Sequence, residues 1–230
     1  MQPIKNRIKR TVMNDRIRKF CKLCNVSLVE AEKKLEEIAG RDCLYFATKK
    51  TKGQAMVWLY FTVISLTKNR IKNILEIGTG KGTTTNIISN LFPESQIYTI
   101  DLPNSDFSYN KLAVRNVENG EEELRKNINR QNIHFFENNS FFLLTLDLPE
   151  YFDFIYIDGG HNYPTVAWDF MFSYNKLNKN GFLFMDDYNR PGTDVKSMVD
   201  FLIKIIPEKV HFLPWAYYDK NAKYCWLQKI

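Results

Sequence analysis

The stretch that decides the fold is Ile74-Leu75-Glu76-Ile77-Gly78-Thr79-Gly80-Lys81-Gly82-Thr83. It begins as a hydrophobic strand, turns through three glycines and continues into a helical pattern. Glycines in such a turn let the backbone approach a ligand closely, and the helix that follows presents free N–H groups toward it. The segment therefore predicts a ligand-binding turn between the first strand and the first helix of an α/β sheet.

The spacing of these glycines separates the ligand classes that use such a turn. A phosphate-binding P-loop requires G-x-x-x-x-G-K-[ST], but Leu75 stands at its first glycine position and Gly82 at its hydroxyl position. The dinucleotide fingerprint G-x-G-x-x-G would need glycine at Thr83, and an acid two positions before the first glycine is unusual for it. The spacing therefore excludes a P-loop nucleotide triphosphatase and disfavours a nicotinamide cofactor.

Downstream of this turn, strand patterns alternate with helical patterns, which is typical of a parallel sheet with helices on both faces. The last two strands are separated by only about nine residues, too few for a crossover helix, so we expect them to pair antiparallel. The predicted fold class is α/β, a doubly wound seven-stranded sheet whose last strand is antiparallel. The expected strands are Asn73 to Ile77, Gln96 to Ile100, Ile133 to Phe136, Phe152 to Ile157, Gly181 to Met185, Lys209 to Leu213 and Lys223 to Gln228. The expected helices are Gln54 to Leu66, Thr83 to Leu91, Gly120 to Ile128, Phe141 to Leu146, Pro164 to Leu177 and Val195 to Ile206.

The region before the sheet is predicted to be a helical cap. Ser27 and Glu30 have capping-box spacing, and apolar residues then recur at three- and four-residue intervals. We therefore expect an N-terminal helical extension over residues 1–53 and the ligand-binding domain over residues 54–230. Within that domain the polar stretch from Pro103 to Asn119 is long for a connection, and we expect it to form a flap over the site.

The glycine turn resembles the first motif of the class I methyltransferases, which reads acidic, apolar, Gly, x, Gly, x, Gly and is matched by Glu76 to Gly82. The resemblance runs from about Gln54 to the C-terminus. It implies S-adenosylmethionine as the cofactor and the Rossmann-like methyltransferase fold. It also implies that the backbone of Gly78, Thr79 and Gly80 contacts the methionine and ribose part, with Glu76 near the amino group.

The same resemblance implies two further cofactor contacts. In this family an acid that ends the second strand accepts hydrogen bonds from the ribose hydroxyls, and Asp101 stands there. The polar residue that meets adenine after the third strand falls on Asn139 or Ser140, although Asn139 is also suited to cap a helix. The family's Gly-Asp pair is replaced here by Asn138-Asn139.

Acidic residues follow two further strands. The strand from Phe154 to Ile157 ends in Asp158-Gly159-Gly160-His161, and the strand from Phe182 to Met185 ends in Asp186-Asp187. The carboxyl ends of strands line the active crevice in doubly wound sheets, so we expect these three carboxylates to lie close together. They repel one another unless a cation or proton neutralises them, and oxygen ligands suit Mg²⁺, Ca²⁺ or Mn²⁺.

This acidic arrangement is similar to that of the metal-dependent small-molecule O-methyltransferases of the catechol and macrocin types. The similarity implies a divalent metal, Mg²⁺ by preference, held by Asp158, Asp186 and Asp187 and in turn holding the substrate hydroxyl. Those enzymes have a lysine three residues after the first metal aspartate or an aspartate two residues after it. Here these positions carry His161 and Gly160, so we expect His161 to be the general base, with Asp158 beside it in the catalytic set.

Histidine suits that role because its usual pKa lies near neutrality. A structural cap or a metal ligand remains an alternative for His161. The pattern Asp-Gly-x-His-x-Tyr-x-x-Val, from Asp158 to Val166, also resembles a bacterial subgroup of class I methyltransferases.

Charge is distributed unevenly along the chain. Residues 1–72 carry 17 Lys and Arg against 6 Asp and Glu, whereas residues 73–230 carry 15 against 20. A basic segment is typical of a solvated helical face, or of a surface that binds nucleic acid or an anionic membrane. Against a nucleic-acid substrate, the Asn/Asp-Pro-Pro-aromatic motif of N-methylating enzymes is absent after the fourth strand.

We therefore expect an enzyme that transfers a methyl group to a small-molecule acceptor, at a hydroxyl oxygen. The alternatives are a nucleic-acid methyltransferase and a non-catalytic cofactor-binding scaffold.

The first twenty residues lack an apolar run of signal-peptide length, and Ala55 to Leu66 is too short to span a bilayer, so we expect a cytoplasmic protein. A homo-oligomer is compatible with the basic N-terminal helices. Cys21 and Cys24 have the spacing of one buried helical stripe, so we expect a structural pair of reduced thiols.

Overall fold

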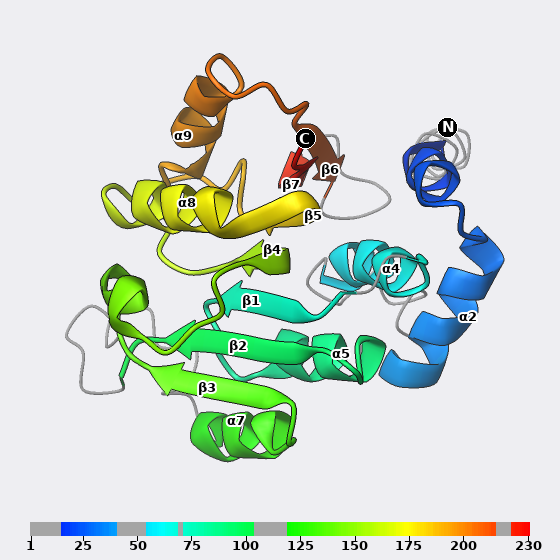
Figure 1. Cartoon of the computed structure of the whole chain (residues 1–230), viewed down its shortest axis with the longest axis horizontal. Coiled ribbons are helices and arrows are strands. Elements are labelled where there is room, and N and C mark those ends of the chain that lie inside the picture. The colour runs from blue at the N-terminus through cyan, green and yellow to red at the C-terminus, as the bar shows by residue number, and fades with distance from the viewer. Residues whose placement is uncertain (1–14, 41–53, 69–70, 104–118, 215–221) are drawn as a thin grey trace, which may run out of the picture. The chain divides into compact units, whose positions relative to one another are not determined.

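The computed structural model describes residues 15–40, 54–68, 71–103, 119–214 and 222–230 (Figure 1). The predicted flap lies almost entirely outside these residues. The chain divides into two compact units, Met1–Arg70 with Leu213–Tyr224 and Ile71–Phe212 with Cys225–Ile230. The first unit runs to Arg70, and the predicted domain boundary at residue 53 stays a prediction.

The sheet has seven strands in the order β3-β2-β1-β4-β5-β7-β6. The first five strands pair in parallel, and β7 pairs antiparallel to β5, so the predicted fold class is confirmed. β5 begins earlier than the sequence predicted, and β6 lies slightly later. The strands are β1 (Asn73–Ile77), β2 (Gln96–Asp101), β3 (Ile133–Glu137), β4 (Phe152–Ile157), β5 (Leu177–Met185), β6 (His211–Pro214) and β7 (Ala222–Gln228).

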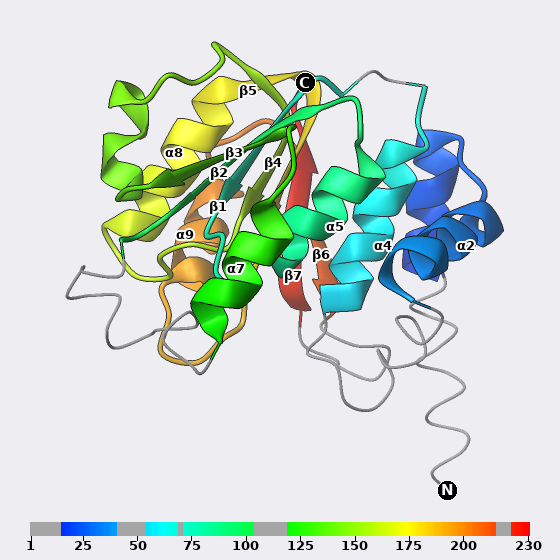
Figure 2. The same cartoon turned by 90° about the horizontal axis from the view of Figure 1, so that it is seen from below.

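Helices cover both faces of this sheet. The pair α5 and α7 lies on one face, and α8 and α9 lie on the other (Figure 2). The bounds are α5 (Thr83–Leu91), α7 (Gly120–Ile128), α8 (Thr165–Lys176) and α9 (Val195–Leu202), and the segment predicted as a helix after β3 is a 3-10 helix, η1 (Ser140–Thr145).

Helix α9 is shorter than predicted. Beyond Leu202 the backbone bonds change to a three-residue spacing, from Lys204 N–H to Phe201 and from Ile205 N–H to Leu202. Pro207 follows, and the residue before a proline is disfavoured in the helical region. The apolar periodicity therefore continues past the end of the helix itself.

The first unit is helical in its described part. Residues 15–24 form a helix, followed by α2 (Leu28–Ala39) and α4 (Gln54–Ser65). The Ser27 side chain accepts a hydrogen bond from the Glu30 backbone N–H, so the predicted cap is confirmed. In the described part of the chain, no helix combines the length and the hydropathy needed to cross a bilayer.

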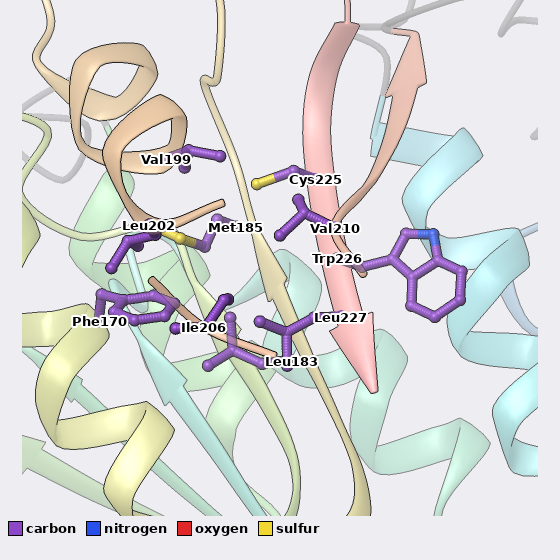
Figure 3. Close-up of a pocket in the computed structure, with 10 residues that line it drawn as sticks. All are labelled: Phe170, Leu183, Met185, Val199, Leu202, Ile206, Val210, Cys225, Trp226 and Leu227. Atoms are coloured by element: carbon purple, nitrogen blue, oxygen red, sulfur yellow. The ribbon is translucent and has the colours of Figure 1, made fainter. Parts of the chain in front are cut away.

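The core of the sheet is aromatic around β4. The fully buried Phe154 ring lies 5.9 Å from that of Phe92 and 5.8 Å from that of Phe184. Behind β5, an apolar pocket opens between α8, α9 and β7 (Figure 3). Its lining side chains are apolar apart from the indole nitrogen of Trp226, and none of them is charged. The residues shown around it include Phe170, Met185, Val199 and Cys225.

We expect Phe154→Ala to lower the free energy of unfolding by about 3–5 kcal/mol, because the cavity left in a fully buried aromatic cluster cannot collapse completely. Urea unfolding followed by circular dichroism measures this loss. The matched control is Phe142→Ala, whose ring is 54% exposed and whose loss should change stability by no more than about 0.5 kcal/mol. Equal effects of the two variants would contradict this description of the core.

Candidate active site

Backbone hydrogen bonds continue one residue beyond the carboxyl ends of three strands, β1, β4 and β5. Gly78 N–H donates to Ile100, Asp158 N–H donates to Ile77, and the bonds measure 2.9 and 2.7 Å. Asp186 N–H likewise donates to Ile157 at 2.9 Å. The residues that follow β1, β4 and β5 therefore lie side by side at one edge of the sheet, as the sequence predicted.

The glycine turn packs directly on the loop that carries Asp158. Gly78 has a φ of 100°, and a Cβ built on it would lie 2.1 Å from the Asp158 carbonyl oxygen. No side chain can therefore occupy this position, both because of the left-handed backbone and because of the contact. Next to it, the buried Thr79 hydroxyl pairs with that of Thr99 at 2.7 Å.

Asp101 lies against the same turn. Its Oδ2 accepts a hydrogen bond from Gly80 N–H at 2.5 Å, and its Oδ1 accepts one from Leu102 N–H at 2.8 Å. A carboxylate offers about four lone-pair positions, so these bonds leave capacity for further donors. Its position at the end of β2 fits the predicted contact with ribose hydroxyls.

Glu76 is completely buried beneath the turn. Its Oε2 accepts hydrogen bonds from the hydroxyls of Thr85 and Thr99 at 2.5 and 2.7 Å, but its Oε1 has no partner among the described residues. Burial raises the pKa of Glu76 to about 8, against the two threonine bonds, and the carboxylates of Asp158 and Asp101 add to the rise. The raised pKa favours the neutral carboxyl group near pH 7, and when the group ionises Oε1 can accept a hydrogen bond from a charged amino group. This fits the cofactor amino group implied by the resemblance.

The two residues proposed for adenine have local partners. The Asn139 side chain accepts a hydrogen bond from Phe141 N–H at 3.0 Å and so caps η1, which is the alternative noted from the sequence. Ser140 is buried, and its carbonyl accepts a bond from Trp168 Nε1 at 2.8 Å. Their contact with adenine stays a prediction.

At the acidic edge, the structure gathers Asp158, His161 and Asp187. One ligand atom from each lies within 4.8 Å of the other two. His161 Nε2 lies 3.6 Å from Asp158 Oδ1 and 3.4 Å from Asp187 Oδ2. This nitrogen is buried and has no hydrogen-bond partner among the described residues.

Asp186 lies at the same strand end but is bonded differently. Its Oδ1 accepts from Asp187 N–H at 2.5 Å, and its Oδ2 accepts from the Tyr156 hydroxyl at 3.3 Å. Asp187 has a φ of 57°, a left-handed conformation that aspartate tolerates better than most residues. The predicted carboxylate triad is thus only partly gathered, because the third donor beside Asp158 and Asp187 is His161.

The charges around His161 set its protonation. Burial alone lowers the pKa of His161, but the carboxylates of Asp158 and Asp187 outweigh it, so the pKa is raised above its usual value. Arg190 Nη1 bonds Asp187 Oδ2 at 2.7 Å and supplies a second positive charge. Without another cation, the imidazole therefore holds a proton more tightly than a free histidine does.

Two residues of this site had no clear signal in the sequence. Asp169 on α8 is fully buried, and burial raises its pKa to about 7, while the neighbouring Ser140 hydroxyl and His161 ring act in the opposite direction. A Cβ on Gly159 would lie 3.1 Å from Asp169 Oδ2, so Asp169 supports the acidic loop from beneath. Arg190 lies in the loop after β5. Its position three residues after Asp187 is the one feature of the sequence that indicates a role in this site.

The Cys21 and Cys24 pair belongs to the first unit. Burial raises the pKa of the Cys21 thiol to about 11 and that of Cys24 to about 12, so neither is a thiolate at neutral pH. Both are free thiols. These properties agree with a structural pair.

Part of this chain is similar in sequence to a known family of protein domains. Residues 75–188 match a family model described as a methyltransferase domain. The matched segment is just under half of the chain and includes the glycine turn and every acidic residue of the site. A protein of Acanthamoeba polyphaga mimivirus is 35% identical over 77 residues, which cover 30% of this chain and 35% of that relative. The chain thus aligns with only about a third of the relative's length.

Solved structures share the fold. The O-methyltransferase NovP superposes with a TM-score of 0.61 and 14% identity, covering 87% of this chain and 98% of NovP. TomG from Streptomyces achromogenes, an O-methyltransferase of tomaymycin synthesis solved in complex with SAM, has a TM-score of 0.55 and 16% identity over 87% of this chain and 89% of its own. At these identities the likeness concerns the fold alone.

We expect binding of S-adenosylhomocysteine at pH 7 to release a proton, because the neutral Glu76 should ionise when a charged amino group reaches it. Calorimetry in two buffers of different ionisation enthalpy measures the release, which should approach about one proton and vanish in Glu76→Gln. Glu94→Ala, at an exposed surface carboxylate, is the control and should behave as the wild type. Equal apparent enthalpies in both buffers for the wild type would contradict the neutral state.

Proposed function

We propose that this chain, whose residues 75–188 match a methyltransferase domain, transfers the methyl group of S-adenosylmethionine to a hydroxyl oxygen of a small-molecule acceptor. The observation that carries the proposal is the backbone contact between Gly78 and Asp158, which joins the glycine turn to the acid and histidine cluster. A methyl donor bound at the turn would lie beside groups that can take a proton. The fold shared with two O-methyltransferases supports the same reaction type.

In this proposal the cofactor lies over the turn. The backbone of Gly78, Thr79 and Gly80 follows its methionine and ribose part, and Glu76 Oε1 accepts a hydrogen bond from its amino group. Asp101 accepts bonds from the ribose hydroxyls, and the loop of Asn139 and Ser140 borders the adenine. The unpartnered Oε1 of Glu76 and the position of Asp101 at the end of β2, bonded to Gly80 N–H of the turn, support these roles.

The transfer is a displacement at the methyl carbon. The acceptor oxygen forms a bond to this carbon while the bond from carbon to sulfur breaks, and S-adenosylhomocysteine leaves. The proton of the hydroxyl passes to the cluster of Asp158, His161 and Asp187. Asp158 and His161 are therefore the proposed catalytic side chains. Their main contribution is to orient the oxygen in line with the methyl-sulfur bond and to accept the proton.

A divalent cation fits the donors of this cluster. Two carboxylates converge with a buried imidazole nitrogen that has no hydrogen-bond partner among the described residues, and a divalent cation can bind this donor set. When bound, the cation supplies a Lewis acid that lowers the pKa of the acceptor hydroxyl. Asp158 and Asp187 are the ligands common to the sequence-based triad and to the observed cluster.

We expect Asp101→Ala to weaken S-adenosylhomocysteine binding by roughly 10- to 100-fold, since it removes charge-assisted hydrogen bonds to the ribose. Isothermal calorimetry measures this against wild type, with Glu94→Ala as a surface carboxylate control. Asp101→Asn should lose less, because an amide oxygen still accepts one bond. Failure of the wild type to bind would remove the proposed cofactor and with it the proposed function.

We expect Asp158→Asn to reduce methyl transfer by at least about 100-fold with cofactor binding nearly unchanged, because it disrupts the group nearest the acceptor. Radiolabelled S-adenosylmethionine offered with hydroxylated phenols, sugars and polyketides, and separately with RNA, measures transfer. Label in the small molecules supports the proposal, whereas label only in RNA would assign the nucleic-acid alternative. Turnover that survives chelation would remove the cation from the mechanism.

A further inference from the structure

The position of His161 has a consequence for the kind of cation that the cluster selects. The sequence assigned three carboxylates to the site, but the donors that converge are two carboxylates and one imidazole nitrogen. We infer that Asp158, His161 and Asp187 form a mixed oxygen and nitrogen site for a first-row transition cation such as Mn²⁺, Co²⁺ or Zn²⁺, with His161 Nε2 as the third ligand in place of Asp186. This inference rests on the proposed function only in locating the ion at the acceptor end.

The distances around His161 are those of ligands that share an ion. Hydrogen bonds between nitrogen and oxygen measure about 2.7–3.2 Å. The separations from His161 Nε2 to Asp158 and Asp187 are 3.6 and 3.4 Å, which is too long for good hydrogen bonds. Donors bound about 2.0–2.2 Å from one cation, at angles of 90–109°, lie roughly 2.9–3.6 Å apart. The two separations from His161 Nε2 are therefore compatible with ligands of one ion, and all three donor atoms lie within 4.8 Å of one another.

Asp186 already has other partners. Its two oxygens accept hydrogen bonds from Asp187 N–H and from the Tyr156 hydroxyl. These bonds hold Asp186 behind the cluster, and its oxygens are not among the converging donors. The Tyr156 hydroxyl lies 3.3 Å from Asp158 Oδ2 as well as from Asp186 Oδ2, so its single proton is shared between the two acids, whereas the bond from Asp187 N–H belongs to Asp186 alone.

The nitrogen donor changes the preference among cations. Imidazole suits transition ions, whereas Mg²⁺ and Ca²⁺ prefer sites built only from oxygen. At a given site, affinity rises from Mn²⁺ through Co²⁺, while Mg²⁺ seldom accepts a nitrogen ligand. Asp158 and Asp187 supply two negative charges that suit any of these ions, so His161 is the residue that makes the difference.

Coordination also fixes the role of the His161 ring. A ligating Nε2 must be unprotonated, so the proton of the neutral ring sits on Nδ1. A coordinated Nε2 cannot also take the acceptor proton, so this inference assigns His161 the ligand alternative and leaves proton acceptance, within the proposed function, to the carboxylates of the cluster. Arg190 bonds the same Asp187 oxygen that faces His161, and a carboxylate has lone pairs enough for both an arginine and an ion.

Titration calorimetry of the full chain with CoCl₂ and MgCl₂, each alone, tests the site. We expect Co²⁺ to bind at least roughly tenfold more tightly than Mg²⁺, and His161→Ala to weaken Co²⁺ by at least roughly tenfold with Mg²⁺ changed less than about threefold. Asp186→Asn should change Co²⁺ affinity by less than about threefold, provided that its circular dichroism spectrum matches wild type. Glu94→Ala is the surface control.

Nuclear magnetic resonance identifies the ligand directly. The chain has three histidines, His134, His161 and His211, so ¹⁵N signals of the imidazoles can be assigned by single substitutions. Addition of diamagnetic Zn²⁺ should shift the Nε2 signal that is missing in His161→Gln and leave the other two histidines unchanged. This measurement needs neither cofactor nor acceptor.

Three results would overturn the inference. The first is Mg²⁺ binding that is as tight as Co²⁺ binding and that is abolished by Asp186→Asn but not by His161→Ala. The second is the absence of binding by either ion. The third is an unshifted His161 signal when Zn²⁺ is bound. The proposed function fails separately, when S-adenosylhomocysteine does not bind or no hydroxyl is methylated. Methyl transfer without ion binding would therefore remove this site alone.

Discussion

The site depends on one backbone contact, that of Gly78 with the carbonyl of Asp158. Parallel pairing brings Ile77 beside Ile157, so the residue after each strand end meets its neighbour with no room for a side chain. The contact makes the cofactor turn and the acidic loop a single rigid surface. A methyl donor and the group that activates the acceptor can then be held at a fixed separation without a hinge between them, which is what a displacement reaction requires.

A buried acid supports this surface from below. Glu76 links three elements, because it belongs to β1 and accepts hydrogen bonds from Thr85 on α5 and Thr99 on β2. A charged carboxylate at this depth would be expensive, and the raised pKa shows that the protein keeps it neutral until a partner arrives. The same group can thus be tolerated in the core and still be available to a cationic ligand.

The sequence predicted those parts of the site that follow from strand ends. The glycine turn, Asp101 and Asp158 each come directly after a strand, and the rule that such ends meet at one edge needs only the strand pattern. The sequence could not predict the division between Asp186 and Asp187. Adjacent in the chain, they differ because a left-handed φ at Asp187 separates the two side chains, and Tyr156 holds one of them. The position of the His161 backbone depends on another loop, because Asp194 N–H donates to the His161 carbonyl.

Asp158, Asp186 and Asp187 differ in the groups that pair with their carboxylates. Three ionised carboxylates at one edge of the sheet repel one another, and their hydrogen-bond and ion-pair partners differ. Asp186 is satisfied by hydrogen bonds from Tyr156 and from the backbone, and it therefore holds the end of β5 in place. Asp158 and Asp187 instead face a nitrogen at distances too long for strong hydrogen bonds. Asp187 is paired with Arg190 and also faces His161, so a fixed positive charge lies beside the converging donors. The donor atoms that converge at this edge are thus those of Asp158, His161 and Asp187, whereas the Asp186 carboxylate accepts the backbone N–H that follows it.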